Sequence, residues 1–119
     1  ASKYALESNN NIFWIVGGLP KLGDIFYSSK VKENIVRSYI IGKNLNFYQR
    51  QLKNKVKYSI TKTLDISLKM IFKELIKRKE KAATVLLSPA SASFDQYKNF
   101  EERGLEFKKL VKLYANRYL

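Results

Sequence analysis

The stretch "NIFWIVGG", residues 11–18, decides the fold of this chain. It is an apolar run of strand length that ends in two glycines and is bounded by Asn and Pro, a pattern typical of a strand buried on both faces. Such strands occur in parallel sheets that helices cover on both sides. The stretch therefore predicts an α/β domain with a layered architecture.

The remaining segments alternate between strand-like and helix-like patterns. The β-branched and aromatic run "IVRSYIIG" (35–42) predicts a second strand, "VKYSI" (56–60) predicts a short one, and "ATVLLS" (83–88) predicts a further buried strand. A polar helix is expected at 44–54. Strands that alternate with helices imply crossover connections and a parallel sheet.

Two longer helices complete the predicted pattern, after a short one that ends within residues 2–8. Residues 63–77 place Leu64, Leu68, Ile71, Phe72 and Leu75 on one face. Thr63 is the expected N-cap, and Asp65 puts a negative charge near the positive helix end. The last helix carries its apolar face on Phe100, Phe107, Leu110, Val111 and Tyr114.

Composition limits the chemistry that this chain can perform. Its 119 residues, 45% of them apolar, predict one globular domain with a real core. The absence of cysteine and histidine excludes disulfides, thiolate metal sites and a histidine base, so any chemistry must use Lys, Ser, Thr, Asp, Glu or backbone groups. No apolar run approaches the roughly 20 residues of a membrane span, and we expect a soluble, cytoplasmic protein that contacts no membrane.

The net charge of +13 raises a second functional hypothesis. Such a charge is typical of proteins that bind polyanions, and a small basic α/β module that binds RNA is one interpretation. However, the lysines are scattered over almost every segment, as a coding bias toward lysine would also produce. The charge alone leaves both interpretations open, and we favour the bias.

Two loops follow predicted strands at the sheet edge where parallel α/β domains bind ligands. "GGLPK" (17–21) offers an anion clamp, in which the glycines let the backbone approach a ligand closely and Lys21 supplies a cation, or only a turn with one more surface lysine. "SPASASFDQ" (88–96) offers hydroxyl and backbone donors worth roughly 1.5–3 kcal/mol each to a charged ligand. The alternative for the second loop is a helix cap made by Ser93 or Asp95. From the residues alone, the two interpretations of this loop are equally good.

The run "VLLSPASASFDQYKNFEERGLEFKKLV" (85–111) resembles the C-terminal signature of the Mur ligases, in the branch that adds D-glutamate to UDP-N-acetylmuramoyl-L-alanine. "NIFWIVGGLPKLGD" (11–24) and "ITKTLDISLKMI" (60–71) resemble upstream segments of the same domain. Ser91 departs from the family's usual Cys. The family's opening strand and its Ser-Lys-Ala-Thr-Asn type loop are not found before Ala1.

The resemblance implies a Rossmann-like three-layer domain with a mostly parallel sheet flanked by helices, in which the family's first strand is missing. Residues 1–119 would be the C-terminal, amino-acid-binding domain of a three-domain ligase, truncated at its N-terminal edge. The missing strand would leave an exposed sheet edge and a tendency to associate. A stand-alone remnant of a split gene, with only a structural role, is a further hypothesis.

The resemblance also implies the chemistry of the parent enzyme. That enzyme would use ATP and Mg²⁺, bound mainly by domains absent from this chain, to form an acyl phosphate in peptidoglycan synthesis. Lys21, Ser93, the backbone around Phe94, and Phe100 would hold D-glutamate. The missing domains would bind UDP-N-acetylmuramoyl-L-alanine. No catalytic residue, metal ligand or nucleic-acid partner is expected here, and the isolated chain should be inactive.

Overall fold

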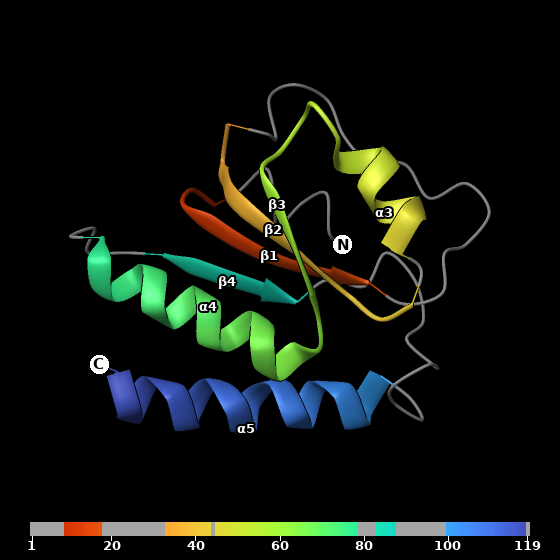
Figure 1. Cartoon of the computed structure of the whole chain (residues 1–119). Coiled ribbons are helices and arrows are strands. Elements are labelled where there is room, and N and C mark those ends of the chain that lie inside the picture. Colours follow the sequence, from red (N-terminus) through yellow and green to blue (C-terminus); the bar gives the residue numbers. More distant parts are fainter. Residues whose placement is uncertain (1–8, 18–32, 44, 79–82, 88–99, 119) are drawn as a thin grey trace.

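A computed structural model describes residues 9–17, 33–43, 45–78, 83–87 and 100–118 of the chain. Within these ranges the chain forms four strands and three helices (Figure 1). In chain order they are β1 (Ile12–Gly17), β2 (Ile35–Ile41), α3 (Leu45–Leu52), β3 (Tyr58–Lys62), α4 (Leu64–Lys77), β4 (Thr84–Leu87) and α5 (Phe100–Tyr118). The predicted helix end at residues 2–8 lies outside the described residues.

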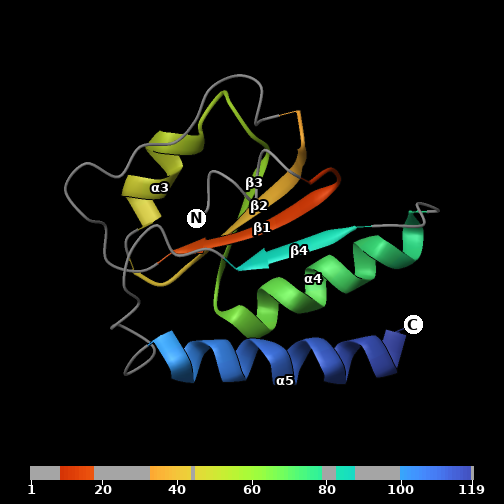
Figure 2. The same ribbon diagram turned by 180° about the vertical axis from the view of Figure 1, so that it is seen from behind.

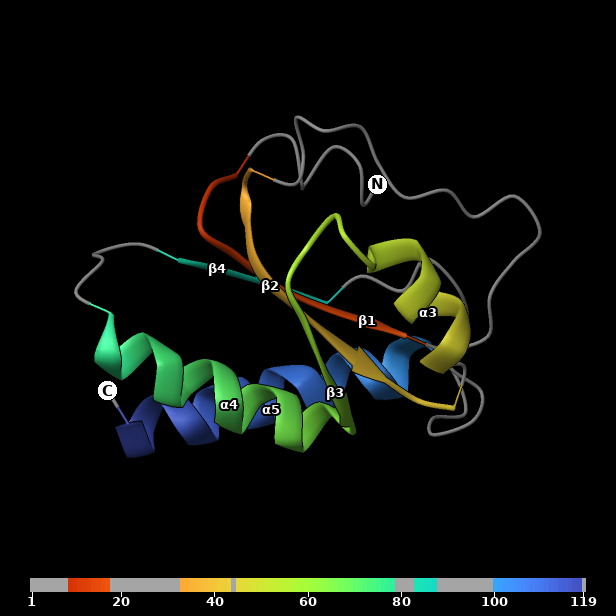
Figure 3. The same cartoon turned by 45° about the horizontal axis from the view of Figure 1, so that its top comes forward.

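The four strands form one sheet in the order β3-β2-β1-β4, and every neighbouring pair is parallel. Helix α3 covers one face of the sheet, while α4 and α5 lie on the other, as Figures 1 and 2 show from opposite sides. Figure 3 shows α5 running alongside α4. The predicted three-layer α/β architecture is therefore confirmed.

Strand β1 is the centre of the core. Ile12, Trp14 and Val16 pack toward α3, in a cluster that includes Tyr48 and Leu52. The alternate residues of β1, Phe13 and Ile15, pack toward α4 and α5. All six residues of the strand are buried, and each large apolar side chain stabilises the fold by about 1.5–3 kcal/mol. Burial of this strand on both faces, predicted from residues 11–18, is confirmed.

Helix α4 begins and packs as its sequence predicts. The Thr63 side chain accepts a hydrogen bond from the Ile66 amide at 3.2 Å, so Thr63 is the N-cap. The buried stripe consists of Leu64, Leu68, Ile71 and Phe72, with Leu75 partly buried at its end. In α5, Leu110 and Tyr114 are buried against the same cluster, and Phe107 and Val111 are partly buried. The predicted inner face of the last helix is confirmed for these four residues.

Two strand predictions need correction. Strand β4 was expected to be buried, but each of its residues is only half-buried. The reason is its position, because β1 is its only partner in the described part of the sheet. Strand β3 begins at Tyr58, two residues later than the predicted start. The register between β2 and β3 shifts between Ile40 and Ile41 of β2, and Ile41 is the partner of Lys62 at the end of β3.

Candidate functional site at the carboxyl edge of the sheet

The strand order reverses beside β1. The chain runs from β1 outward to β2 and β3, and then returns to add β4 on the other side of β1. In open parallel sheets, ligands bind outside the carboxyl ends of the strands at such a switch point. The topology therefore places the candidate site at the carboxyl ends of β1 and β4.

The two predicted ligand loops start from this point. Ile15 of β1 is the partner of Leu87, the last residue of β4, so the two strands end side by side. The segment that follows β1 contains Lys21, and the segment that follows β4 contains Ser93 and Phe94. These three residues lie outside the described residues. Phe100 is described only as the first residue of α5, without its side chain. The contacts of all four residues remain predictions.

Gly17 ends β1 and is packed against the neighbouring strand. A Cβ atom at Gly17 would lie 2.2 Å from the carbonyl oxygen of Ile41 and 2.8 Å from its Cγ1 atom. A side chain therefore cannot fit without moving the backbone. The sequence predicted that glycine here lets the backbone approach a ligand. The structure shows a different requirement for Gly17, the close approach of β2, which the sequence pattern alone did not reveal.

The turn that joins β3 to α4 lies at the same edge and is held by buried hydroxyl groups. Thr61 Oγ1 donates to the Ile40 carbonyl at 3.3 Å and lies 2.6 Å from Ser67 Oγ. The Ser67 hydroxyl in turn donates to the Thr63 carbonyl at 2.9 Å. Lys62 takes a left-handed conformation with φ of 67°, which makes the tight bend possible. These bonds fix where α4 starts relative to the strand ends.

A second connection at this edge joins α4 to α5. The Tyr114 hydroxyl donates a hydrogen bond to Oδ1 of Asp65, and Lys69 Nζ lies 3.6 Å from Oδ2 of the same carboxylate. The hydrogen bond to Asp65, together with burial, raises the pKa of Tyr114 to about 12. The sequence predicted only that Asp65 favours the positive end of α4. Its bond to Tyr114 anchors α5, the helix that follows the 88–99 segment, to the first turn of α4.

Neither a cluster of metal ligands nor a membrane-spanning helix occurs among the described residues. No group of three Asp or Glu side chains gathers there, so this part of the chain supplies no set of ligands for Mg²⁺. None of the described helices is both long enough and apolar enough to cross a bilayer. What the described part does provide at the carboxyl edge is the paired ends of β1 and β4, which the segments 18–32 and 88–99 follow in the sequence.

The sheet and its switch point define a class: a parallel, three-layer α/β domain with its ligand edge at the ends of β1 and β4. Within that class, the chain is homologous to UDP-N-acetylmuramoylalanine–D-glutamate ligases. It is 46% identical to the ligase of a Wolbachia species from Brugia malayi over 90% of the chain. Identity is 40% with the ligase of Bradyrhizobium diazoefficiens over 93% of the chain, and 41% with that of Rhizobium meliloti over 90%.

The matched region is a limited part of each relative. The chain spans 21% of the Wolbachia ligase, 24% of the Bradyrhizobium ligase and 23% of the Rhizobium ligase. No family model matches the chain. The resemblance to the Mur ligases predicted from residues 85–111 is nonetheless confirmed by these relatives, whereas the hypothesis of an RNA-binding module finds no support among them.

Proposed function

We propose that this chain is the C-terminal, amino-acid-binding part of a ligase that adds D-glutamate to UDP-N-acetylmuramoyl-L-alanine in peptidoglycan synthesis. The observation that carries the proposal is identity of 40–46% with such ligases over nine-tenths of the chain. The switch point beside β1 supports it independently, because β1 and β4 end side by side there, and the segments that contain the proposed ligand residues follow these two strands in the sequence. The parent enzyme is proposed to work in the cytoplasm.

The proposed role of the chain is to position the amino acid. Lys21 would neutralise one carboxylate of D-glutamate, while Ser93 and the backbone near Phe94 would donate hydrogen bonds to it. Phe100 would close the apolar side of the site. Holding the D-glutamate amine in line with an activated carboxyl group lowers the activation barrier. The translational and rotational entropy of bringing the two groups together has already been lost on binding. The paired ends of β1 and β4 support this role, since a positioned ligand needs a fixed frame.

ATP and Mg²⁺ belong to the parent enzyme in this proposal. When bound, they would activate the carboxyl group of the UDP-sugar substrate as an acyl phosphate. We assign both groups mainly to parts of the ligase outside this chain. The chain by itself is then expected to form no amide bond.

A chimeric enzyme tests the proposal. The aligned segment of the Wolbachia ligase is replaced by this chain, and phosphate release is measured while D-glutamate and the UDP-sugar are varied in turn. We expect D-glutamate-dependent turnover. Substituting Lys21→Ala or Ser93→Ala removes a hydrogen bond to a charged ligand, and should raise the KM for D-glutamate by roughly tenfold to a hundredfold.

The control variant is Lys109→Ala, which removes an exposed lysine from α5. It should leave both KM values unchanged, and none of the three substitutions should alter the KM for the UDP-sugar more than slightly. Unchanged D-glutamate kinetics in both site variants would refute the residue assignments. A folded chimera that binds the UDP-sugar without using D-glutamate would refute the proposed function itself.

A further inference from the structure

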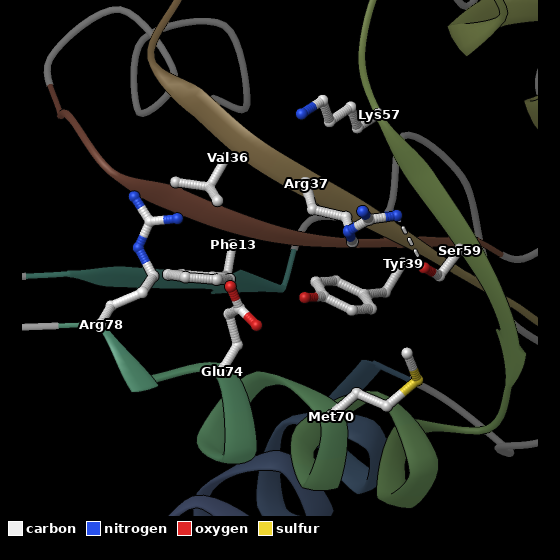
Figure 4. Close-up of a pocket in the computed structure, with 9 residues that line it drawn as sticks. All are labelled: Phe13, Val36, Arg37, Tyr39, Lys57, Ser59, Met70, Glu74 and Arg78. Carbon is white, nitrogen blue, oxygen red and sulfur yellow. Dashed lines mark hydrogen bonds between the residues drawn. The ribbon is translucent and has the colours of Figure 1, made fainter. Parts of the chain in front are cut away.

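A hollow lies at one edge of the sheet, opposite the edge that holds the candidate amino-acid site (Figure 4). Its volume is about 370 Å³, toward the lower end of the range of small-molecule pockets, roughly 300–1,000 Å³. It lies where β1, β2 and β3 begin, against the second half of α4. Its lining residues are Phe13, Val36, Arg37, Tyr39, Lys57, Ser59, Met70, Glu74 and Arg78.

Tyr39 is the most informative of these residues. Only 2% of it is exposed, yet its hydroxyl group points into the hollow (Figure 4). This hydroxyl has no hydrogen-bond partner among the described residues. Burial raises the pKa of Tyr39 to about 12, so the group stays protonated and can donate at neutral pH. A hydroxyl group that faces a hollow and has no protein partner can donate a hydrogen bond to a ligand there.

Arg37 is held in place on the β2–β3 side of the hollow. Its Nη1 atom donates to the Tyr58 carbonyl at 3.2 Å and to Ser59 Oγ at 3.0 Å. The guanidinium is therefore oriented before any ligand arrives, and its other N–H groups have no partner among the described residues. Lys57 extends a second cation toward the same side.

The charged side chains are distributed unevenly around the hollow. The α4 side contributes one cation, Arg78, and one anion, Glu74, to the lining. The β2–β3 side carries two cations, Arg37 and Lys57, and no acid among the lining residues. An anion is therefore attracted most strongly to the β2–β3 side. Val36 and Met70 add apolar surface to the hollow, and Phe13, which also lines it, is fully buried.

We infer that this hollow binds a small organic anion, a carboxylate or a phosphate ester with an apolar body. Its anionic group takes donors from Arg37, Lys57 and the Tyr39 hydroxyl. Its apolar body rests on the surface formed by Val36 and Met70. The site is separate from the D-glutamate site, because it lies at the amino ends of the strands, and it does not depend on the proposed ligase function.

Calorimetric titration of the full chain tests this site with four probes. Phenyl phosphate and benzoate each carry an anion and a ring, phenol has the ring without the charge at neutral pH, and inorganic phosphate has the charge without the ring. We expect one of the ring-bearing anions to bind at least tenfold more tightly than phenol and inorganic phosphate. The tighter of the two identifies the natural ligand as a phosphate ester or a carboxylate. Failure of both to bind would overturn the inference.

Matched variants locate the binding. Tyr39→Phe removes only the hydroxyl, and Lys57→Gln removes an exposed charge, so both should fold normally, with thermal melts as the check. Each should weaken binding of the preferred anion about tenfold or more. Tyr118→Phe and Lys109→Gln make the same changes on α5 and should have no effect. Binding that is unchanged by Tyr39→Phe and Lys57→Gln, or that is weakened equally by the α5 controls, would refute the site.

Discussion

Substituting Gly17→Ala is the sharpest test of how the carboxyl edge is built. The new Cβ atom would lie 2.2 Å from the carbonyl oxygen of Ile41, whereas an ordinary contact begins at 3.4 Å. The two strands would have to separate by about 1 Å, and close-packed interiors resist such a shift. The obstructing atom belongs to the backbone of a paired strand, so it cannot rotate away. We expect a cost of about 3 kcal/mol, the upper end of the usual range for overpacking.

Thermal unfolding followed by circular dichroism measures this cost. For a chain of this size, a loss of about 3 kcal/mol should lower the Tm by roughly 10 °C. Gly104→Ala is the matched control, because nothing lies within 4 Å of a Cβ atom at that position in α5. Alanine there should stabilise the chain by about 0.5–1 kcal/mol through its better helix propensity. A Gly17→Ala variant that melts at or above the unmodified chain would refute the reasoning.

Three further predictions concern α4 and the buried tyrosines. Thr63→Ala removes the hydrogen bond to the Ile66 amide and should cost about 1 kcal/mol in urea unfolding, while Thr63→Ser should cost much less; equal losses would contradict the cap. Tyr114→Phe should cost about 1 kcal/mol, a modest loss because the freed Asp65 side chain is 43% exposed and can hydrate. The pKa values of Tyr39 and Tyr114 are raised from 10.0 to about 12, so the stability they contribute is complete below pH 10 and is lost as the pH rises toward 12. Replacing both tyrosines with Phe should therefore reduce the loss of stability over that range, and an unchanged alkaline profile would show that other groups control it.

The elements with strong local signals could be predicted from the sequence. Residues 11–18 form an apolar run too short for a long helix, and the structure buries β1 on both faces. Helix α4 combines a periodic apolar stripe with Thr63 as a cap, and both features act within one or two turns. Strand β4 shows the limit of this reasoning. Its apolar sequence is the same whether it lies in the centre or at the edge of the described sheet, and only the strand order distinguishes the two.

Contacts between distant segments could not be predicted. Asp65 and Tyr114 are 49 residues apart, and no periodic pattern links them. The need for glycine at position 17 comes from Ile41, a residue of another strand. The candidate site could be proposed from the sequence because a family motif marks Ser93 and its neighbours, and its contacts stay a prediction. The anion hollow has no such motif, since its lining residues come from separate elements of the fold.

The pairing of β1 with β4 also determines when the ligand edge can form during folding. Ile12 and Thr84 are partners although most of the chain lies between them, and such non-local parallel contacts form slowly. As the protein is synthesised, β1, β2 and β3 emerge well before β4. Until β4 joins the sheet, one side of β1 has unpaired backbone groups that invite association with other chains. The carboxyl edge of the sheet is therefore complete only after the last strand has docked beside β1.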